Sequence, residues 1–90
     1  MPQANVDPSE LRRFAQDLTR FSTDLRGLMS GLHARMLGLE KTWRDQEQRR
    51  FFQEFEQTVK TLNRFLDSSD AHVQFLAKKA AHVEDYLGQH

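Results

Sequence analysis

Hydrophobic residues in the first half of the chain recur at alternating intervals of three and four positions. The residues at these intervals are Leu11, Phe14, Leu18, Phe21, Leu25, Leu28 and Leu32. Such spacing is typical of an α-helix that packs lengthwise against another helix. The pattern continues through Met36, Leu39 and Trp43 after one additional four-residue interval, which predicts a local unwinding of the helix pair.

The residues before this stripe resemble the start of a helix. Asp7 can accept a hydrogen bond as the N-cap, Pro8 suits the first helical position, and Glu10 can return a hydrogen bond to the cap. No proline follows Pro8, so long helices are expected. The first helix is therefore predicted over about residues 8–42, after a short flexible N-terminus over residues 1–7.

A second stripe runs through the other half of the chain without a change of phase. Its members are Phe52, Phe55, Val59, Leu62, Leu66, Ser69, Val73, Leu76, Ala80, Val83 and Leu87. Segment 67–70 could by composition form a turn, but the phase passes through Ser69 unchanged, which predicts one helix over about residues 46–88. Asp45 followed by Gln48 resembles a cap for this helix. The fold predicted for residues 8–90 is one all-α domain, a helix-turn-helix hairpin of two long antiparallel helices with its turn over about residues 43–45.

More hydrophobic residues are present than one hairpin can bury. Phe51, Phe65 and Tyr86 lie one residue before stripe positions and form a second ridge, while Phe75 lies outside both. A buried Phe contributes about 2 to 3 kcal/mol relative to an exposed one, so we expect two hairpins to dimerise into an elongated four-helix bundle. The alternative is a hairpin that leaves some aromatic residues in water. The residues expected at the dimer or partner interface are Leu18, Phe21, Leu25, Leu28, Phe51, Phe52, Phe55, Leu62, Phe65, Leu66 and Leu76.

The first helix also carries a stripe of small residues at intervals of four, three and four. Its members are Gly27, Gly31, Ala34 and Gly38. Small residues on one face let two backbones approach closely, so this stripe is a candidate for a close helix crossing in the bundle. Glycine also weakens a helix by about 1 kcal/mol relative to alanine. A soft or kinked helix without a crossing is the equally weighted alternative.

Composition narrows the functions that this chain can perform. Thirteen basic and thirteen acidic residues give no net charge, which argues against nucleic acid as a partner. The predicted helices carry opposite charge, since 8–42 has six basic and four acidic residues and 45–88 has six basic and eight acidic residues. Opposite charges favour pairing between helices.

No catalytic, metal or cofactor site is predicted. The chain has no Cys, and none of its four histidines, His33, His72, His82 and His90, has metal-ligand spacing. The N-terminus lacks a Sec signal, and no stretch approaches the roughly 18 apolar residues of a membrane span. We therefore expect no membrane insertion, and a cytoplasmic protein unless a Sec-independent route exports it.

A tryptophan stands at the predicted turn, in Trp43-Arg44-Asp45, and the aromatic pair Phe51-Phe52 follows at the start of the second helix. With its short length, two long helices and absence of Cys, the chain resembles the WXG family, the early-secreted-antigen-like helical hairpins of type VII secretion. Asp45 stands where the family has Gly; Asp tolerates left-handed or tight turns and can also cap the next helix. The resemblance implies that Trp43 borders a recognition cleft between two hairpins. The position of Trp43 on the first stripe favours packing against the second helix, and the two roles are compatible.

The resemblance implies function as a non-enzymatic protein-interaction module, a secretion substrate or partner subunit. Its partner is then a second copy or a related hairpin, with a secretion ATPase as a further partner. The family's export pattern Tyr-x-x-x-Asp/Glu is not matched at Tyr86, because His90 occupies the acidic position. The alternative function is an intracellular helical adaptor or regulatory subunit that docks on a larger protein.

Overall fold

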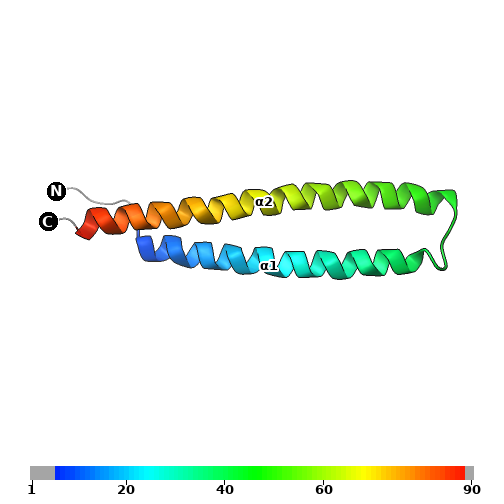
Figure 1. Ribbon diagram of the computed structural model, residues 1–90, viewed down its shortest axis with the longest axis horizontal. Helices are drawn as coiled ribbons and strands as arrows, with labels where there is room; N and C mark the ends of the chain where they lie inside the picture. Colours follow the sequence, from blue (N-terminus) through cyan, green and yellow to red (C-terminus); the bar gives the residue numbers. More distant parts are fainter. Residues whose placement is uncertain (1–5, 89–90) are drawn as a thin grey trace.

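The computed structural model describes residues 6–88 and consists of two long antiparallel helices joined by one turn (Figure 1). Helix α1 spans Pro8–Leu39 and helix α2 spans Gln46–Gly88. The molecule is a rod with extents of 70 × 17 × 13 Å, and the helices contact one another along its length. The all-α hairpin that the stripes predict is confirmed. Most of the predicted flexible N-terminus over residues 1–7 lies outside the described residues.

Helix α1 begins at the predicted cap. The Asp7 carboxylate accepts a hydrogen bond from the backbone N–H of Ser9 at 2.9 Å, and Pro8 occupies the first helical turn, where its missing N–H costs nothing. Glu10 does not return a bond to the cap as expected. Its carboxylate instead accepts from the Arg13 guanidinium at 3.1 Å. The N-terminus of α1 is therefore fixed mainly by Asp7.

Helix α1 ends at Leu39, three residues before the predicted end. The next three residues tighten into a turn, because the N–H groups of Glu40, Lys41 and Thr42 each bond the carbonyl three residues earlier. Bonds of this type commonly end an α-helix and satisfy its last carbonyl groups. Helix α2 then starts after Asp45, whose carboxylate accepts from the Gln48 N–H at 2.9 Å.

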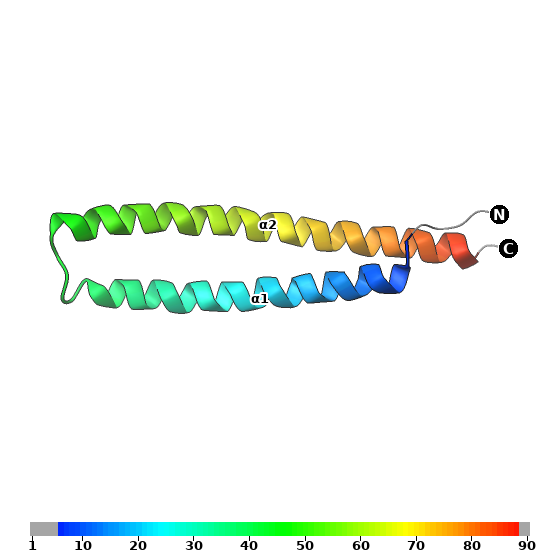
Figure 2. The same ribbon diagram turned by 180° about the vertical axis from the view of Figure 1, so that it is seen from behind.

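Helix α2 places its predicted stripe against α1. Leu66, Ser69, Ala80 and Val83 are buried, and the other members are half-buried with the exception of Leu87. The helix passes through segment 67–70 without interruption, as its hydrophobic phase indicates. Leu87 is exposed because α2 extends beyond the first residue of α1, as the end carrying both termini in Figure 2 shows.

The predicted stripe of α1 is only partly correct. Its alternate members Leu11, Leu18 and Leu25 are half-buried, but Phe14, Phe21, Leu28 and Leu32 are exposed. The residues of α1 that are buried against α2 are Met36, which belongs to the continued stripe, and Ala15 and Ser22, which lie outside it. The line of contact is thus rotated toward small residues, and the largest hydrophobic side chains remain on one flank of α1.

Residue size explains how the helices approach one another. The ribbons lie closer together near the termini than near the turn (Figures 1 and 2). Near the termini the buried residues Ala15, Ser22, Ser69 and Ala80 are small, so the two backbones can approach closely. Near the turn the half-buried residues Phe52 and Phe55 of α2 are large, so the backbones are expected to lie farther apart there.

Ser22 is a buried hydroxyl without a hydrogen-bond partner. Its side chain is 1% exposed, and its Oγ has no donor or acceptor within reach in the described part of the chain. An unpaired buried polar group costs about 1 to 3 kcal/mol. Ser22→Ala is therefore expected to raise the free energy of unfolding by about 1 kcal/mol, measured by urea denaturation followed by circular dichroism.

The matched control is Ser30→Ala, an exposed serine on the same helix. Both changes gain the higher helix propensity of alanine, so the difference between them isolates the buried hydroxyl. A Ser22→Ala variant no more stable than Ser30→Ala would show that Ser22 is satisfied in solution.

Candidate interaction surface

The two long sides of the hairpin differ in chemistry. On one side, the apolar face, lie large hydrophobic residues that are between 41% and 71% exposed. Residues seven positions apart lie on the same side of a helix that packs in a heptad pattern. The exposed hydrophobic residues of α1 recur at this interval, so they lie together. We define this face by Phe14, Phe21, Leu28, Leu32 and Leu39 of α1 and Phe51, Phe65 and Phe75 of α2.

Two grooves run between the helices on the apolar face. The first, of about 390 Å³, lies toward the termini and is lined by Phe14, Leu18, Phe65, Ser69, His72, Phe75 and Leu76. The second, of about 200 Å³, lies toward the turn and is lined by Leu32, Arg35, Met36, Leu39, Phe51 and Phe55. Between them Phe21 and Phe65 meet edge to face with ring centroids 6.1 Å apart. The apolar face is therefore nearly continuous along the rod.

The opposite side, the polar face, carries the ion pairs between the helices. Arg12 binds Glu84 with two hydrogen bonds of 2.9 and 2.5 Å, and Arg26 binds Asp70 at 2.7 Å. His33 lies 3.7 Å from Glu56. The basic members lie at heptad intervals on α1 and the acidic members at heptad intervals on α2, so the two rows face each other along the rod.

The Arg12–Glu84 pair shifts the titration of both groups. Its side-chain hydrogen bonds, supported by charge attraction, hold the pKa of the Glu84 carboxyl below its usual range and raise the pKa of Arg12. Because the folded pKa of Glu84 is lowered, its contribution to stability is present at neutral pH and is lost as the pH falls through that lowered pKa. Both side chains are exposed, so the pair sets the helix register more than it stabilises the fold.

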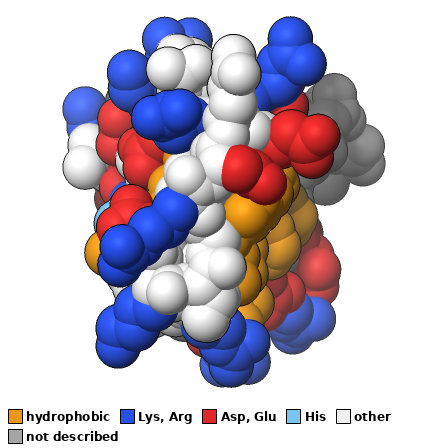
Figure 3. All heavy atoms as spheres, turned by 90° about the vertical axis from the view of Figure 1, so that its right-hand side faces the viewer, with side chains coloured by type: hydrophobic (Ala, Val, Ile, Leu, Met, Phe, Trp, Pro, Cys, Tyr) orange, Lys and Arg blue, Asp and Glu red, His pale blue; other side chains and the backbone are white. Residues whose placement is uncertain are grey.

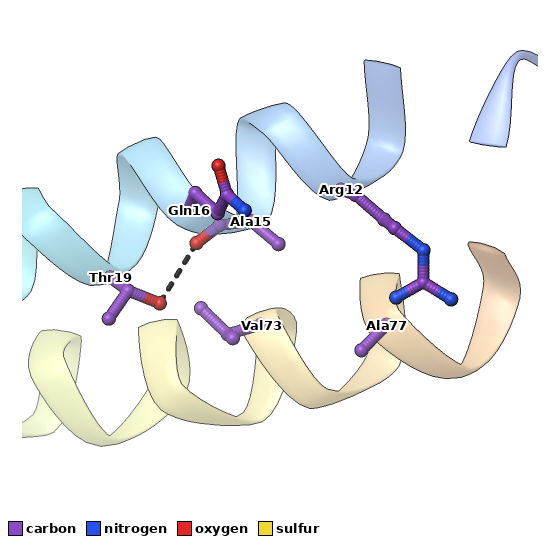
Figure 4. Close-up of a pocket in the computed structure, with 6 residues that line it drawn as sticks. All are labelled: Arg12, Ala15, Gln16, Thr19, Val73 and Ala77. Carbon is purple, nitrogen blue, oxygen red and sulfur yellow. Dashed lines mark hydrogen bonds between the residues drawn. The ribbon is translucent and has the colours of Figure 1, made fainter. Parts of the chain in front are cut away.

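The polar face also has hollows, and polar and apolar side chains line them together. Figure 4 shows one of about 300 Å³ in which Arg12 reaches over Ala77 while the Thr19 hydroxyl donates to the carbonyl of Ala15. A larger one, lined in part by Arg26, Ser30, His33 and Asn63, lies nearer the turn. Arg12 and Arg26, which line these hollows, are already paired with Glu84 and Asp70 of α2.

An aromatic cluster closes the turn end of the rod. Trp43 packs on Phe51 and Phe52 with centroid distances of 5.7 and 6.5 Å, and Phe51 continues to Phe55 at 5.9 Å. The Arg44 guanidinium donates to the Glu40 carbonyl at 2.9 Å. Figure 3, which views this end, shows hydrophobic side chains gathered in a patch beside the turn, amid basic and acidic ones.

The sequence model of one protein family, described as proteins of 100 residues with WXG, matches residues 3–86. The chain belongs to the WXG100 family. Its members are small helical proteins associated with type VII secretion. Searches of curated proteins and of solved structures found no significant match to this WXG100 chain.

The WXG100 turn motif is occupied by Trp43, Arg44 and Asp45. Trp43 is half-buried, which agrees with packing against the second helix. No residue among 6–88 has a positive φ, so the turn is made without a left-handed residue. Asp45 caps α2 as predicted, and this hairpin needs no glycine at its turn.

The predicted interface residues fall into three groups. Phe21, Leu28, Phe51 and Phe65 are exposed on the apolar face. Leu66 is 1% exposed and belongs to the core between α1 and α2, so it has no surface to offer a partner. The remaining residues are half-buried between the helices, namely Leu18, Leu25, Phe52, Phe55, Leu62 and Leu76.

Residues that the predicted interface lacks also reach the apolar face. Phe14 and Leu32 are members of the first stripe, and their sizes alone mark them as candidates. Phe75 and His72 line the groove near the termini, although neither belongs to a stripe. His72 lies seven residues after Phe65, and this heptad interval is the signal that could have placed it on the face.

The small-residue stripe does not mark a crossing between α1 and α2. Gly27, Gly31, Ala34 and Gly38 are exposed, and a Cβ added at any of the three glycines would meet nothing within 4 Å. The three glycines thus border open space, and Ala34 lines the larger hollow of the polar face. Contact between this stripe and another molecule stays a prediction.

The described residues contain no candidate metal site and no membrane-spanning helix. Within residues 6–88, no group of three or more His, Asp or Glu side chains could hold a metal ion. His82 is exposed, and Tyr86 is exposed near the end of α2. His90 lies outside the described residues. Neither helix, as described, combines the length and the apolar character that a membrane crossing requires.

The cap at Asp45 gives a test of the turn. Asp45→Ala removes the carboxylate that binds the Gln48 N–H and is expected to lower the free energy of unfolding by about 1 kcal/mol. Asp45→Gly, which restores the family's residue, is expected to cost only a few tenths of a kcal/mol. Both values are measured by urea denaturation.

Asp67→Ala, at an exposed position inside α2, is the matched control. It removes the same carboxylate without removing a cap, and it is expected to leave stability unchanged or slightly raised. Equal losses for Asp45→Ala and Asp67→Ala would mean that the cap does not stabilise the turn.

Proposed function

We propose that this WXG100 hairpin is a non-enzymatic protein-interaction module of type VII secretion, acting as a substrate or partner subunit. It pairs through its apolar face with a second hairpin to form a four-helix bundle. The observation that carries the proposal is the arrangement of side chains. Eight large hydrophobic residues are exposed together on one side of the rod, while the ion pairs between its helices lie on the other.

The size of the apolar face suits a stable dimer. The rod is 70 Å long and 17 Å wide, so a second hairpin laid along it covers about 1,000 Å² of each partner, above the roughly 800 Å² of a standard interface. Large hydrophobic side chains exposed together along one side of a protein commonly mark an interaction site. Ring pairs such as Phe21–Phe65 supply rigid contact area at the centre of the face.

The charges favour a second copy of this chain as the occupant. The net charge is zero, so two copies approach without overall repulsion. Arg35 is the only charged side chain that lines the two apolar grooves among the described residues. The apolar face therefore offers few charged groups to a charged partner. The apolar face of a second copy has the same hydrophobic character and can pack against it.

Export is proposed from the family and not from a matched signal. Tyr86 is exposed near the end of α2, but the sequence has histidine where the family's export pattern has Asp or Glu. We propose a Sec-independent route through the type VII apparatus and its ATPase because of family membership alone. Pairing is the part of the function that the residues themselves support.

Two leucines on α1 allow a matched test of the apolar face. Leu28, 71% exposed, lies on the apolar face, and Leu37, 47% exposed, lines a hollow of the polar face. Leu28→Asp is expected to give a helical monomer, because the dimer would have to bury an unpaired carboxylate. Leu37→Asp is expected to remain a dimer.

Size-exclusion chromatography with light scattering measures the mass of each protein at micromolar concentration, and circular dichroism checks that both variants stay helical. The wild-type mass is expected near twice 10.6 kDa. A wild-type monomer that gains mass only with a related hairpin would assign the face to that protein. A monomer that binds a larger, unrelated protein would favour the adaptor function.

A further inference from the structure

Met36 carries a buried thioether beside an open groove. Its side chain is 5% exposed, and it is the largest residue of α1 that is buried against α2. It nevertheless lines the groove of about 200 Å³ near the turn, on the apolar face. A molecule little larger than water can therefore reach this side chain in a single hairpin, and a partner laid on the apolar face would close that approach.

The rest of this groove is almost entirely apolar. Leu32 and Leu39 line it from α1, and the rings of Phe51 and Phe55, with centroids 5.9 Å apart, line it from α2. Arg35 is the only other side chain that lines the groove among the described residues, and it is exposed. A thioether suits this site because it is apolar and fills irregular gaps between larger side chains.

Hydrogen peroxide converts a methionine thioether into a sulfoxide. A lone pair of the sulfur attacks one peroxide oxygen, an S–O bond forms as the O–O bond breaks, and the other oxygen leaves as water. The sulfur is oxidised by two electrons and the peroxide is reduced by two. The product is a polar side chain whose oxygen accepts hydrogen bonds, and methionine sulfoxide reductases reverse the change.

We propose that Met36 is an oxidation site that controls the pairing of the hairpins, since peroxide oxidises it in the free hairpin and the sulfoxide then opposes pairing. This inference rests on the proposed pairing through the apolar face. A sulfoxide oxygen in the groove needs a donor, so it holds water or Arg35 there. A partner must displace that donor or bury an unpaired polar group. A partner already in place covers the groove and protects the thioether.

Met29 provides an internal comparison. It lies one heptad before Met36 on α1, is half-buried, and lines the larger hollow of the polar face. Ser30, His33 and Asn63 also line that hollow, and it stays open when a partner covers the apolar face. Oxidation of Met29 is therefore expected neither to depend on pairing nor to prevent it.

The first test is the rate at which hydrogen peroxide oxidises each methionine of the full chain, read by peptide mass spectrometry in a dilute and a concentrated sample. Light scattering gives the mass in both samples. Oxidation of Met36 is expected to be slower by about fivefold or more where the chain is dimeric, whereas Met29 reacts at the same rate in both. Equal rates for Met36 in monomer and dimer overturn the proposal.

The second test is the dissociation constant of the dimer, measured by sedimentation equilibrium before and after oxidation of the dilute chain. One unpaired polar group weakens pairing roughly tenfold, so two copies are expected to raise Kd by up to about 100-fold. Met36→Leu keeps the size and apolar character of the side chain, and its Kd is expected to change less than about threefold on oxidation.

Met29→Leu is the matched control and is expected to lose pairing on oxidation as the wild type does. Circular dichroism is expected to show that the oxidised wild-type chain stays helical. A loss of helicity overturns the proposal, because the hairpin itself and not its apolar face would then be the target of oxidation.

The outcomes separate this inference from the proposed function. A wild-type dimer whose Kd is unchanged by a sulfoxide at Met36 overturns the inference and leaves pairing intact. A loss of pairing that persists in oxidised Met36→Leu, or that is absent in oxidised Met29→Leu, overturns it as well. A wild-type chain that is monomeric before oxidation contradicts the pairing and, with it, the inference.

Discussion

Two helices packed side by side can bury only one strip of each, and this limit determines the rest of the structure. The chain has more large hydrophobic residues than those strips hold. Small residues such as Ala15 and Ser22 take the buried positions on α1, and the larger Phe14, Phe21 and Leu28 are left on one flank. The hairpin consequently buries small residues between its helices and exposes large hydrophobic residues on one side.

The distribution of charge follows the same division. The ion pairs Arg12–Glu84 and Arg26–Asp70 join the helices on the polar face, where water screens them and they fix the register of α1 against α2. The apolar face has the edge-to-face pair Phe21–Phe65 at its centre. A partner that covers this face completes the core without disturbing the ion pairs.

The sequence predicts the hairpin well because periodicity depends on the backbone, and α2 follows its stripe from Phe52 to Val83. It mispredicts the contact line of α1 because side-chain size was taken as a sign of burial. Where the two helices lie close together, small residues are the buried ones. Ala15 and Ser22 let the backbones approach, and neither belongs to the stripe of large hydrophobic residues. The end of α1 at Leu39 rests on three local hydrogen bonds, which a hydrophobic pattern does not record. His72 was missed for a related reason, because a polar residue on an apolar face leaves no mark in a stripe of hydrophobic positions.

We propose that a second hairpin covers the apolar face in solution. Hydroxyl-radical labelling of the wild-type chain, read residue by residue with mass spectrometry, tests it directly by comparing a dilute with a concentrated sample. Labelling of Phe14, Phe21 and Phe65 is expected to fall as the concentration rises, while labelling of Leu37 on the polar face is expected to stay constant. Equal labelling of the three phenylalanines at both concentrations would contradict it.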